Sequence, residues 1–245
     1  MPHFGLLGKK LSHSFSKTYF EKKWANAQNH SSSYDLYEIE NVLALESFLK
    51  KRKDLAGLNV TIPYKEQIIP YLDALDPVAF EIGAVNCLLS KAGSWVGYNT
   101  DGPAFLKTLE IPFSINRPTK AIVLGAGGAA KAVVWAFHKL AIPVIQVSRN
   151  SELNYQNLRN HWTDDIQMIV NTTPLGMFPD IHTFPNISYE LIKPAFIAYD
   201  LIYNPDKTVF LQKAEMHGAQ IINGKEMLKI QADLSEEIWM KNLML

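Results

Sequence analysis

The chain has 245 residues, 47% of them apolar and 20% charged, which is ordinary for a globular protein of one large domain or two modest ones. Lysine plus arginine equals aspartate plus glutamate at 24 each, so there is no net charge to attract a nucleic acid, and no run of like charge suggests a membrane surface. The single cysteine, Cys87, excludes an internal disulfide and a thiolate metal site.

We expect a soluble, globular protein of the cytoplasm. The first ten residues do not read as a secretory signal, because Lys9 and Lys10 interrupt the apolar run. No stretch approaches the roughly 18 apolar residues of a membrane-spanning helix. The chain is therefore expected to bind no nucleic acid, no membrane and no metal.

Strand-like and helix-like segments alternate along the first hundred residues, an order typical of an α/β fold with parallel sheets. Strands are predicted over residues 3–7, 34–39, 57–61 and 85–89. Helices are predicted near residues 16–26 and over residues 65–71. The character of the chain changes around residues 97–101, and a helix is expected to start near Pro103. A domain boundary is therefore predicted near residue 101.

The clearest local unit follows this boundary. A strand over residues 121–124 leads through a turn of small residues into a helix, and a second strand covers residues 143–147. One face of the helix is apolar at helical spacing, formed by Ala129, Ala132, Val133, Ala136, Phe137 and Leu140. Further strands are predicted over residues 168–171, 196–201 and 220–222, and a final helix over residues 226–242. Residues 150–167 leave little room for a crossover helix.

The turn between the first strand and the helix of this unit favours a dinucleotide site. Its residues are Gly125, Ala126, Gly127, Gly128, Ala129 and Ala130, where alanine is a tolerated variant of the third small residue. Glycines let the backbone approach a pyrophosphate closely, and the helix N-terminus offers N–H groups and a partial positive charge to it. The alternative is an ordinary glycine turn.

The end of the second strand favours NADP over NAD. An NAD site usually has a carboxylate here that accepts from the ribose 2′-hydroxyl. This chain has Ser148, Arg149 and Asn150, about twenty residues past the turn. Arg149 can pair with a 2′-phosphate and stack on the adenine, although a solvated surface arginine is the alternative.

Three groups of polar residues in the first domain are predicted to follow strands, where ligands bind in open α/β sheets. They cover residues 12–16, residues 59–65, and Asn86 together with residues 99–101. Each has a structural alternative, either helix capping or exposure to solvent, which applies to Ser14, Ser16, Lys65 and Asp101. His13 can likewise be a structural hydrogen-bonding residue.

In combination these motifs resemble the shikimate dehydrogenase family, in its order and approximate spacing. The matching segments are residues 13–16, 59–65, 83–86, 99–101, 125–129, 171–177, 200–205 and 224–231. The resemblance implies a substrate-binding α/β domain formed by residues 1–100 with 225–245. It further implies a Rossmann-like NADP-binding domain over residues 101–224 and a C-terminal helix that returns to the first domain.

The resemblance also implies an activity, the reversible NADPH-dependent reduction of 3-dehydroshikimate to shikimate in aromatic amino acid biosynthesis, by a monomer or homodimer. Implied substrate contacts are Ser14, Ser16, Thr61, Asn86, Tyr203 and Gln231. Implied NADP(H) contacts are Gly125, Ala126, Gly127, Gly128, Ala129, Ser148, Arg149, Thr172, Leu201 and Gly224. Lys65 would donate a proton to the carbonyl oxygen as hydride arrives, and Asp101 would orient it.

Three features depart from the family pattern. Lys17 stands where proline is common after the second serine, and the usual histidine and asparagine are replaced in the stretch Thr18-Tyr19-Phe20. Glu152 and Leu153 lie where a second basic residue is frequent. Two other functions remain open. An NAD-dependent quinate/shikimate dehydrogenase is disfavoured by the lack of an acidic residue at 148–150. A non-catalytic NADP-binding sensor on the same fold is disfavoured because both Lys65 and Asp101 are present.

Overall fold

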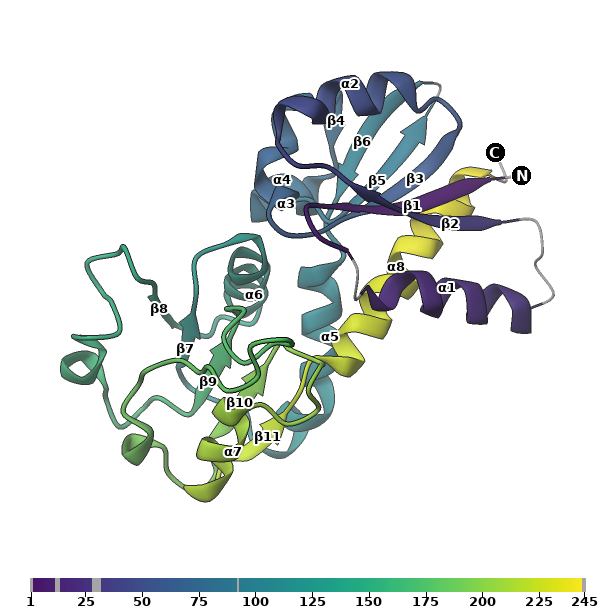
Figure 1. Ribbon diagram of the computed structural model, residues 1–245. Coiled ribbons are helices and arrows are strands. Elements are labelled where there is room, and N and C mark those ends of the chain that lie inside the picture. The colour runs from purple at the N-terminus through teal and green to yellow at the C-terminus, as the bar shows by residue number, and fades with distance from the viewer. Residues whose placement is uncertain (1, 12–13, 28–31, 92, 244–245) are drawn as a thin grey trace. The chain divides into compact units, whose positions relative to one another are not determined.

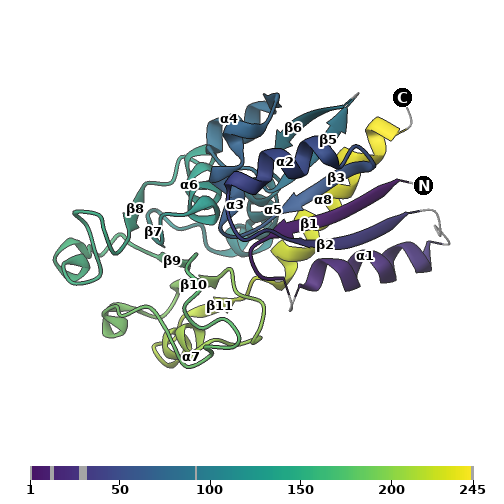
Figure 2. The ribbon, with the colours of Figure 1, turned by 45° about the horizontal axis from the view of Figure 1, so that its top comes forward.

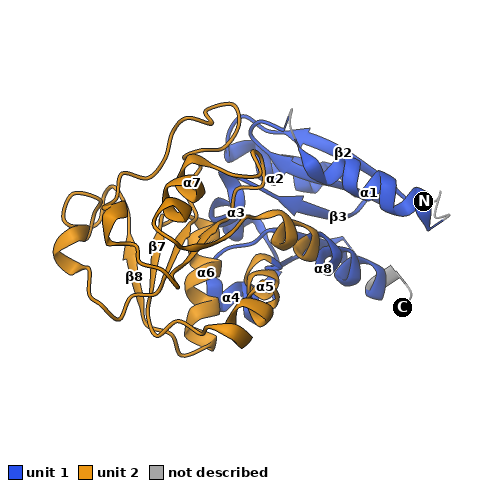
Figure 3. Cartoon of the chain, turned by 90° about the horizontal axis from the view of Figure 1, so that it is seen from below, with its two compact units in different colours: residues 1–100, 232–245 blue, residues 101–231 orange. Residues whose placement is uncertain are grey.

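The computed structural model describes residues 2–11, 14–27, 32–91 and 93–243, and the chain divides into two compact units (Figures 1 and 3). The first unit comprises residues 1–100 and 232–245, and the second comprises residues 101–231. Each unit contains one β-sheet. Among the residues described, we find no helix with the length and apolar character needed to cross a membrane.

The sheet of the first unit has six strands in the order β2-β1-β3-β5-β6-β4. They are β1 (His3–Gly8), β2 (Ser33–Glu38), β3 (Leu55–Val60), β4 (Ala74–Leu75), β5 (Cys87–Lys91) and β6 (Ser94–Tyr98). The prediction of a parallel sheet is wrong at β5, which runs antiparallel to both β3 and β6. The reason is a tight β5–β6 hairpin whose turn includes Gly93 with φ +88°.

Helices cover both faces of this sheet (Figures 1 and 2). They are α1 (Phe15–Asn26), α2 (Leu43–Lys51), α3 (Tyr64–Gln67), the 3-10 helix η1 (Ile69–Tyr71), α4 (Pro77–Ile82) and the last part of α8 (Lys225–Leu243). Because side chains alternate along a strand, Leu6 joins the core beside α1 and α8, whereas Leu7 joins the core beside α2 and α4.

Trp239 anchors the end of α8 to this sheet. Its side chain is fully buried and stacks on Phe4 with ring centroids 4.7 Å apart. Its indole N–H donates to the carbonyl oxygen of Leu88 at 2.9 Å. A Cβ added at Gly57 would lie 2.3 Å from the indole nitrogen, so the absence of a side chain there makes room for the tryptophan. The C-terminal helix is therefore part of the first core.

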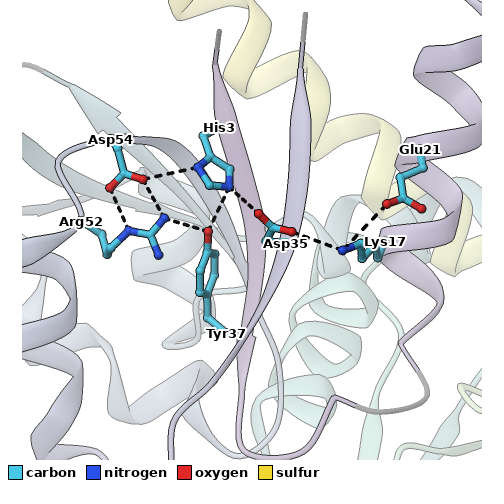
Figure 4. A network of polar contacts seen from close by, with 7 residues as sticks. All are labelled: His3, Lys17, Glu21, Asp35, Tyr37, Arg52 and Asp54. Carbon is cyan, nitrogen blue, oxygen red and sulfur yellow. Dashed lines mark hydrogen bonds and ion pairs between the residues drawn. The ribbon is translucent and has the colours of Figure 1, made fainter. Parts of the chain in front are cut away.

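A polar cluster lies around the amino ends of β1 and β3 (Figure 4). The His3 ring contacts Asp35 at 2.7 Å and Asp54 at 3.4 Å. Arg52 forms a two-pronged ion pair with Asp54, and this lowers the pKa of Asp54 to about 2. Lys17 of α1 reaches Asp35 at 3.2 Å. The residue that replaces the common proline therefore ties the first turn of α1 to β2.

The second unit is a five-stranded parallel sheet in the order β11-β10-β9-β7-β8. Its strands are β7 (Ala121–Leu124), β8 (Val144–Val147), β9 (Met168–Asn171), β10 (Ile197–Asp200) and β11 (Gln220–Ile222). Its helices are α5 (Asp101–Ile115), α6 (Gly128–Lys139), α7 (Val209–Met216), η2 (Leu158–His161) and η3 (Tyr189–Leu191), followed by the start of α8. The short segment between β8 and β9 carries only the 3-10 helix η2, which confirms the expected truncation.

This strand order creates a switch point between β7 and β9. The chain passes from β7 to β8 on one side, and then returns to the other side of β7 to form β9. The loops after β7 and β9 therefore leave in opposite directions from neighbouring strands, and ligands of open α/β sheets typically bind at such a point. The glycine-rich turn follows β7 and Thr172 follows β9, so both lie at this point.

Candidate functional site

Polar residues from distant parts of the sequence meet at one edge of the first sheet. The N–H of Val60, at the end of β3, donates to the carbonyl oxygen of Asn86 at 2.8 Å. The N–H of Val85 donates to the carbonyl oxygen of Lys65 at 2.7 Å. These two bonds bring Thr61, Lys65 and Asn86 to the same edge, which we call the first-sheet edge.

The expectation that Asn86 lies within a strand and near its carboxyl end is wrong. β5 begins at Cys87, so Asn86 precedes it. Because β5 runs antiparallel to β3, the amino end of β5 lies beside the carboxyl end of β3. Asn86 therefore lies at the first-sheet edge because it precedes an antiparallel strand, and not because it follows a parallel one.

A network of buried hydrogen bonds holds the residues next to the first-sheet edge in place. The phenol of Tyr34 donates to Asn59 Oδ1 at 2.8 Å, and Asn59 Nδ2 donates to Ser235 Oγ at 2.9 Å. Asn86 and Thr100 exchange two bonds, Asn86 Nδ2 to Thr100 Oγ1 at 2.9 Å and Thr100 N–H to Asn86 Oδ1 at 2.7 Å. These bonds fix which way the Asn86 amide faces.

Sequence reasoning did not assign Tyr34, Asn59, Thr100 or Ser235 to the site. All four are buried although their side chains are polar. Asn59 and Thr100 fall inside motifs singled out above, so a signal for them was present. Ser235 lies four residues after Gln231 in α8 and thus near the same face of that helix. Tyr34 looks like any strand aromatic, so its sequence position carries no such signal.

The two serines at the start of α1 have structural partners. Ser14 caps the helix, its hydroxyl oxygen accepting from the N–H of Ser16 at 3.3 Å. Ser16 is buried and hydrogen-bonds the phenol of Tyr34, whose pKa is raised well above its ordinary value by burial. His13, which precedes them in the motif, lies outside the described residues. The structural alternative of helix capping is therefore confirmed for Ser14. Its hydroxyl hydrogen can still donate to a ligand, because the cap uses only the hydroxyl oxygen as an acceptor.

The candidate acid–base residues come from different elements. Lys65 lies in the short helix α3 and is half-buried. Asp101 is the first residue of α5 and only 5% exposed. Between the motifs, Asn99 donates to the carbonyl oxygen of Ala84 at 2.9 Å and so fixes the end of β6 beside the segment that leads to Asn86. The catalytic roles of Lys65 and Asp101 stay predictions.

The glycine-rich turn of the second unit has a different requirement at each glycine. Gly125 has φ +122°, and a Cβ there would lie 2.4 Å from the hydroxyl of Thr172. That hydroxyl donates to the carbonyl oxygen of Leu124 at 2.6 Å and closes the switch point. Gly127 has ordinary extended backbone, and a Cβ added there would meet none of the described atoms within 4 Å. Gly128 then begins the twelve-residue helix α6.

This turn fits a dinucleotide pyrophosphate on its geometry. The space above Gly127 is open, and the backbone N–H groups at the start of α6 have no carbonyl within the helix to bind. Gly125 is needed for the turn itself. The remaining residues of the turn, Ala126, Gly128 and Ala129, have at most a methyl group as side chain.

The end of β8 offers an exposed arginine. Ser148 is held by Ser151, which accepts from the Ser148 N–H at 3.1 Å. Arg149 is exposed. Its positive charge acts on the half-buried Tyr155, whose pKa is nevertheless raised because burial dominates. No acidic residue occupies positions 148–150, so the region is suited to an anion.

Two buried polar residues end the neighbouring strands β9 and β10, and they face each other in register. Asn171 Nδ2 donates to Asp200 Oδ1 at 3.1 Å, and neither side chain is exposed. Asp200 also accepts from the Ile202 N–H at 3.1 Å and the Thr208 hydroxyl at 2.6 Å. Burial raises the pKa of Asp200 to about 6 against the lowering effect of these donors. Neither residue was assigned to the site, although each ends an apolar strand with a polar side chain.

The other predicted contacts of the second unit lie in loops near this pair. Leu201 and Tyr203 follow β10, and both side chains are partly exposed. The N–H of Gly224 donates to the carbonyl oxygen of Ile202 at 3.0 Å, and a Cβ there would lie 2.0 Å from the Leu201 oxygen. Gln231 lies further along α8, where its side chain donates to the carbonyl oxygen of Leu228 at 3.0 Å.

Comparison with known proteins gives matches along nearly the whole chain. The family described as the shikimate dehydrogenase substrate binding domain matches residues 6–88. A shikimate dehydrogenase (NADP(+)) of Staphylococcus aureus strain Newman is 34% identical over 96% of this chain and 91% of that protein.

Solved structures match as broadly. Shikimate dehydrogenase 1 from Peptoclostridium difficile has a TM-score of 0.86 and 35% identity, covering 98% of this chain and 92% of the other. Shikimate 5-dehydrogenase from Thermus thermophilus, solved in complex with NADP(H) and shikimate, has a TM-score of 0.84 and 31% identity, covering 98% and 93%.

Proposed function

Because this chain belongs to the shikimate dehydrogenase family, we propose that it catalyses the reversible, NADP-dependent reduction of 3-dehydroshikimate to shikimate. This is an oxidoreductase reaction on a secondary alcohol, and it serves aromatic amino acid biosynthesis. The observation that carries the proposal is the first-sheet edge. Backbone hydrogen bonds gather Thr61, Lys65 and Asn86 there, on a buried network that fixes the Asn86 amide.

The first unit is the proposed substrate-binding part. Shikimate has a carboxylate and ring hydroxyls, which hydroxyl and amide groups can bind. Ser14 and Ser16 would bind the carboxylate, with the Ser16 hydroxyl exchanging its bond to Tyr34 for one to the substrate. Thr61 and Asn86 would bind the ring hydroxyls. Tyr203 and Gln231 are the remaining proposed substrate contacts.

The second unit is the proposed NADP-binding part. The N–H groups around Gly127 and the start of α6 would bind the pyrophosphate, and Arg149 would pair with the 2′-phosphate. Thr172, Leu201 and Gly224 would lie along the ribose and nicotinamide. When bound, NADP(H) supplies or accepts the hydride.

The chain itself must move one proton. In the reductive direction negative charge develops on the carbonyl oxygen, and a donor there stabilises it. An ammonium at Lys65 is competent to donate this proton, and its amine can take the proton back in the oxidative direction. Asp101 would hold the ammonium by charge and orient it. Its carboxylate oxygens can also accept from a substrate hydroxyl.

The proposed place of action is the cytoplasm. The single cysteine, Cys87, is buried and carries a free thiol, which suits a reducing compartment. We propose a monomer or homodimer as the working form, and sedimentation of the purified protein would distinguish the two.

A substrate and cofactor panel tests the proposed activity. Shikimate and quinate are each offered with NADP+ and with NAD+, and nicotinamide absorbance is followed. We expect the highest kcat/KM for shikimate with NADP+. Turnover that prefers NAD+ or quinate would contradict the assignment, and cofactor binding without turnover of either substrate would favour a sensor.

The acid–base role of Lys65 is tested separately. Lys65→Ala is expected to lower kcat by about 10²–10⁴-fold, the range typical of a lost general acid, while NADP+ still binds. Lys53→Ala, at an exposed lysine of the same unit, is the control and should leave kcat unchanged. Normal turnover by Lys65→Ala would remove Lys65 from the mechanism.

A further inference from the structure

Two loops that carry predicted ligand contacts are joined by one buried set of hydrogen bonds. The loop after β9 carries Thr172, and the loop after β10 carries Leu201 and Tyr203. Asn171 and Asp200 end these strands opposite each other, and neither is exposed. Each residue bonds the backbone of its own loop as well as its partner.

Asn171 holds the first loop by both ends of its amide. Its Oδ1 accepts from the N–H of Thr173 at 3.1 Å and from the Thr173 hydroxyl at 2.7 Å. Its Nδ2 donates to the carbonyl oxygen of Leu175 at 3.3 Å and to Asp200 Oδ1 at 3.1 Å. An amide that bonds on both sides has one usable orientation, so the loop has one matching shape.

Asp200 holds the second loop by each carboxylate oxygen. Oδ1 accepts from the N–H of Ile202, whose carbonyl oxygen in turn accepts from the N–H of Gly224. Oδ2 accepts from the hydroxyl of Thr208, which caps α7 by accepting from the N–H of Leu211 at 3.3 Å. The three donors to Asp200 are neutral, and an ionised carboxylate accepts from all of them at once.

We propose that Asn171 and Asp200 act as a positioning pair that locks the loops after β9 and β10 together, and so sets the places of Thr172, Leu201 and Tyr203 for ligand binding. This inference rests on the proposed function only for the identity of the ligands. Because both side chains are fully buried, the pair would act through the residues next to it.

Ionisation of Asp200 matters because a protonated carboxyl has a donor of its own. Its hydrogen would face the Asn171 amide N–H or the Ile202 N–H, which can only donate, or the Thr208 hydroxyl would have to give up its bond to Asp200 and accept instead. The titratable group that faces Asp200 from another element is Tyr189 of η3, whose pKa is raised mainly by burial and further by this carboxylate. An asparagine at position 200 would reproduce the protonated state in shape and charge.

The test compares Asp200→Asn with a control variant that, among the bonds to Asp200, removes only the hydrogen bond to Oδ2. Thr208→Val removes the cap of α7 and one donor to Asp200, but it leaves the bonds to Asn171 and Ile202. We expect Asp200→Asn to raise the Kd for NADP+ about tenfold, the usual weight of hydrogen bonds to a charged group. It should lower kcat/KM for shikimate about a hundredfold through misplacement. Thr208→Val should stay within about threefold of wild type in both, even where its melting temperature falls further.

Two further measurements keep the proposal falsifiable. The ratio of NADP+ Kd values between Asp200→Asn and wild type should fall toward one at pH 5, because the wild-type carboxyl is then protonated and the cofactor phosphate titrates equally in both. Asn171→Ala should reproduce the loss in case Asp200→Asn folds poorly. The proposal is overturned if activity merely follows stability across the variants, or if Asp200→Asn binds NADP+ like wild type. A wild-type protein that binds NADP+ but does not oxidise shikimate would refute the proposed function alone, and the Kd comparison would still decide on the pair.

Discussion

Gly125 and Gly127 are two residues apart, yet the backbone requires only one of them to be glycine. Gly125 has a positive φ and abuts the Thr172 hydroxyl, so any side chain there would be strained and would clash. Gly127 has a backbone that any residue adopts, with open space around its Cβ direction among the described atoms. A glycine that the fold does not require indicates a ligand that comes close to the backbone.

Alanine at each position separates folding from cofactor binding. Gly127→Ala should lower the free energy of unfolding by no more than about 1 kcal/mol, the usual cost of alanine at a helix N-cap. It should raise the Kd for NADP+ at least tenfold, because the methyl group occupies the space where a pyrophosphate would lie. Gly125→Ala should instead destabilise the protein by about 2 kcal/mol or more. Melting curves and calorimetric titration of NADP+ measure both quantities, and unchanged NADP+ affinity in Gly127→Ala would contradict the proposed pyrophosphate site.

At the scale of elements, the C-terminal helix contributes to the first core chiefly through Trp239. This side chain is fully buried against Phe4 and above Gly57, and its N–H has a partner in the Leu88 carbonyl oxygen. Trp239→Ala should lower the free energy of unfolding by about 3–5 kcal/mol, the range for removal of a large buried aromatic. Met216→Ala, at the 85% exposed end of α7, is the control and should stay within about 0.5 kcal/mol. Denaturant unfolding followed by circular dichroism measures both, and equal midpoints for wild type and Trp239→Ala would show that α8 is not anchored this way.

The elements also show where sequence reasoning succeeds and where it stops. The strand, turn and helix around Gly125 were predicted because apolar residues at helical spacing directly follow a glycine turn. Helix α2 was not predicted, although Leu45 and Leu49 fall four residues apart and both are buried. The direction of β5 could not be read from its own residues, because a strand buried on both faces has the same apolar pattern in either direction. The hairpin signal lay outside it, at Gly93.

The site was predicted unevenly for the same reason. Residues such as Ser14 and Lys65 were proposed because they sit in contiguous motifs. Asn171 and Asp200 lie 29 positions apart and become a pair only when β9 and β10 align. Pairing across parallel strands depends on topology, which local spacing does not encode.

For the whole molecule, a change of pH alters the stability contributions of two carboxylates, Asp54 and Asp200, in opposite directions. Arg52 lowers the pKa of Asp54 to about 2, so this exposed carboxylate favours the folded state above pH 4 and loses that effect as the pH falls through its folded pKa. Burial raises the pKa of Asp200 from 3.8 to about 6, so between these values the folded state binds more protons than the unfolded state. The Asp200 contribution to stability therefore falls as the pH rises from 4 to 6.

Asp200→Asn isolates this effect because all other carboxylates are common to both proteins. The difference between a pKa of 3.8 and one of about 6 corresponds to about 3 kcal/mol. Wild type should therefore lose roughly that amount of stability relative to Asp200→Asn between pH 4 and pH 7. Urea unfolding at four pH values in this range gives the difference directly, and parallel curves would contradict a raised pKa at Asp200. The Asp200 carboxylate lowers stability at neutral pH, yet it accepts from Asn171 at the end of β9 and from Ile202 and Thr208 in the loop after β10. This is understandable if loop geometry matters more than stability at this position. As the pH rises from 4 to 7, Asp200→Asn should therefore become more stable relative to wild type. Over the same range its affinity for NADP+ should become weaker relative to wild type.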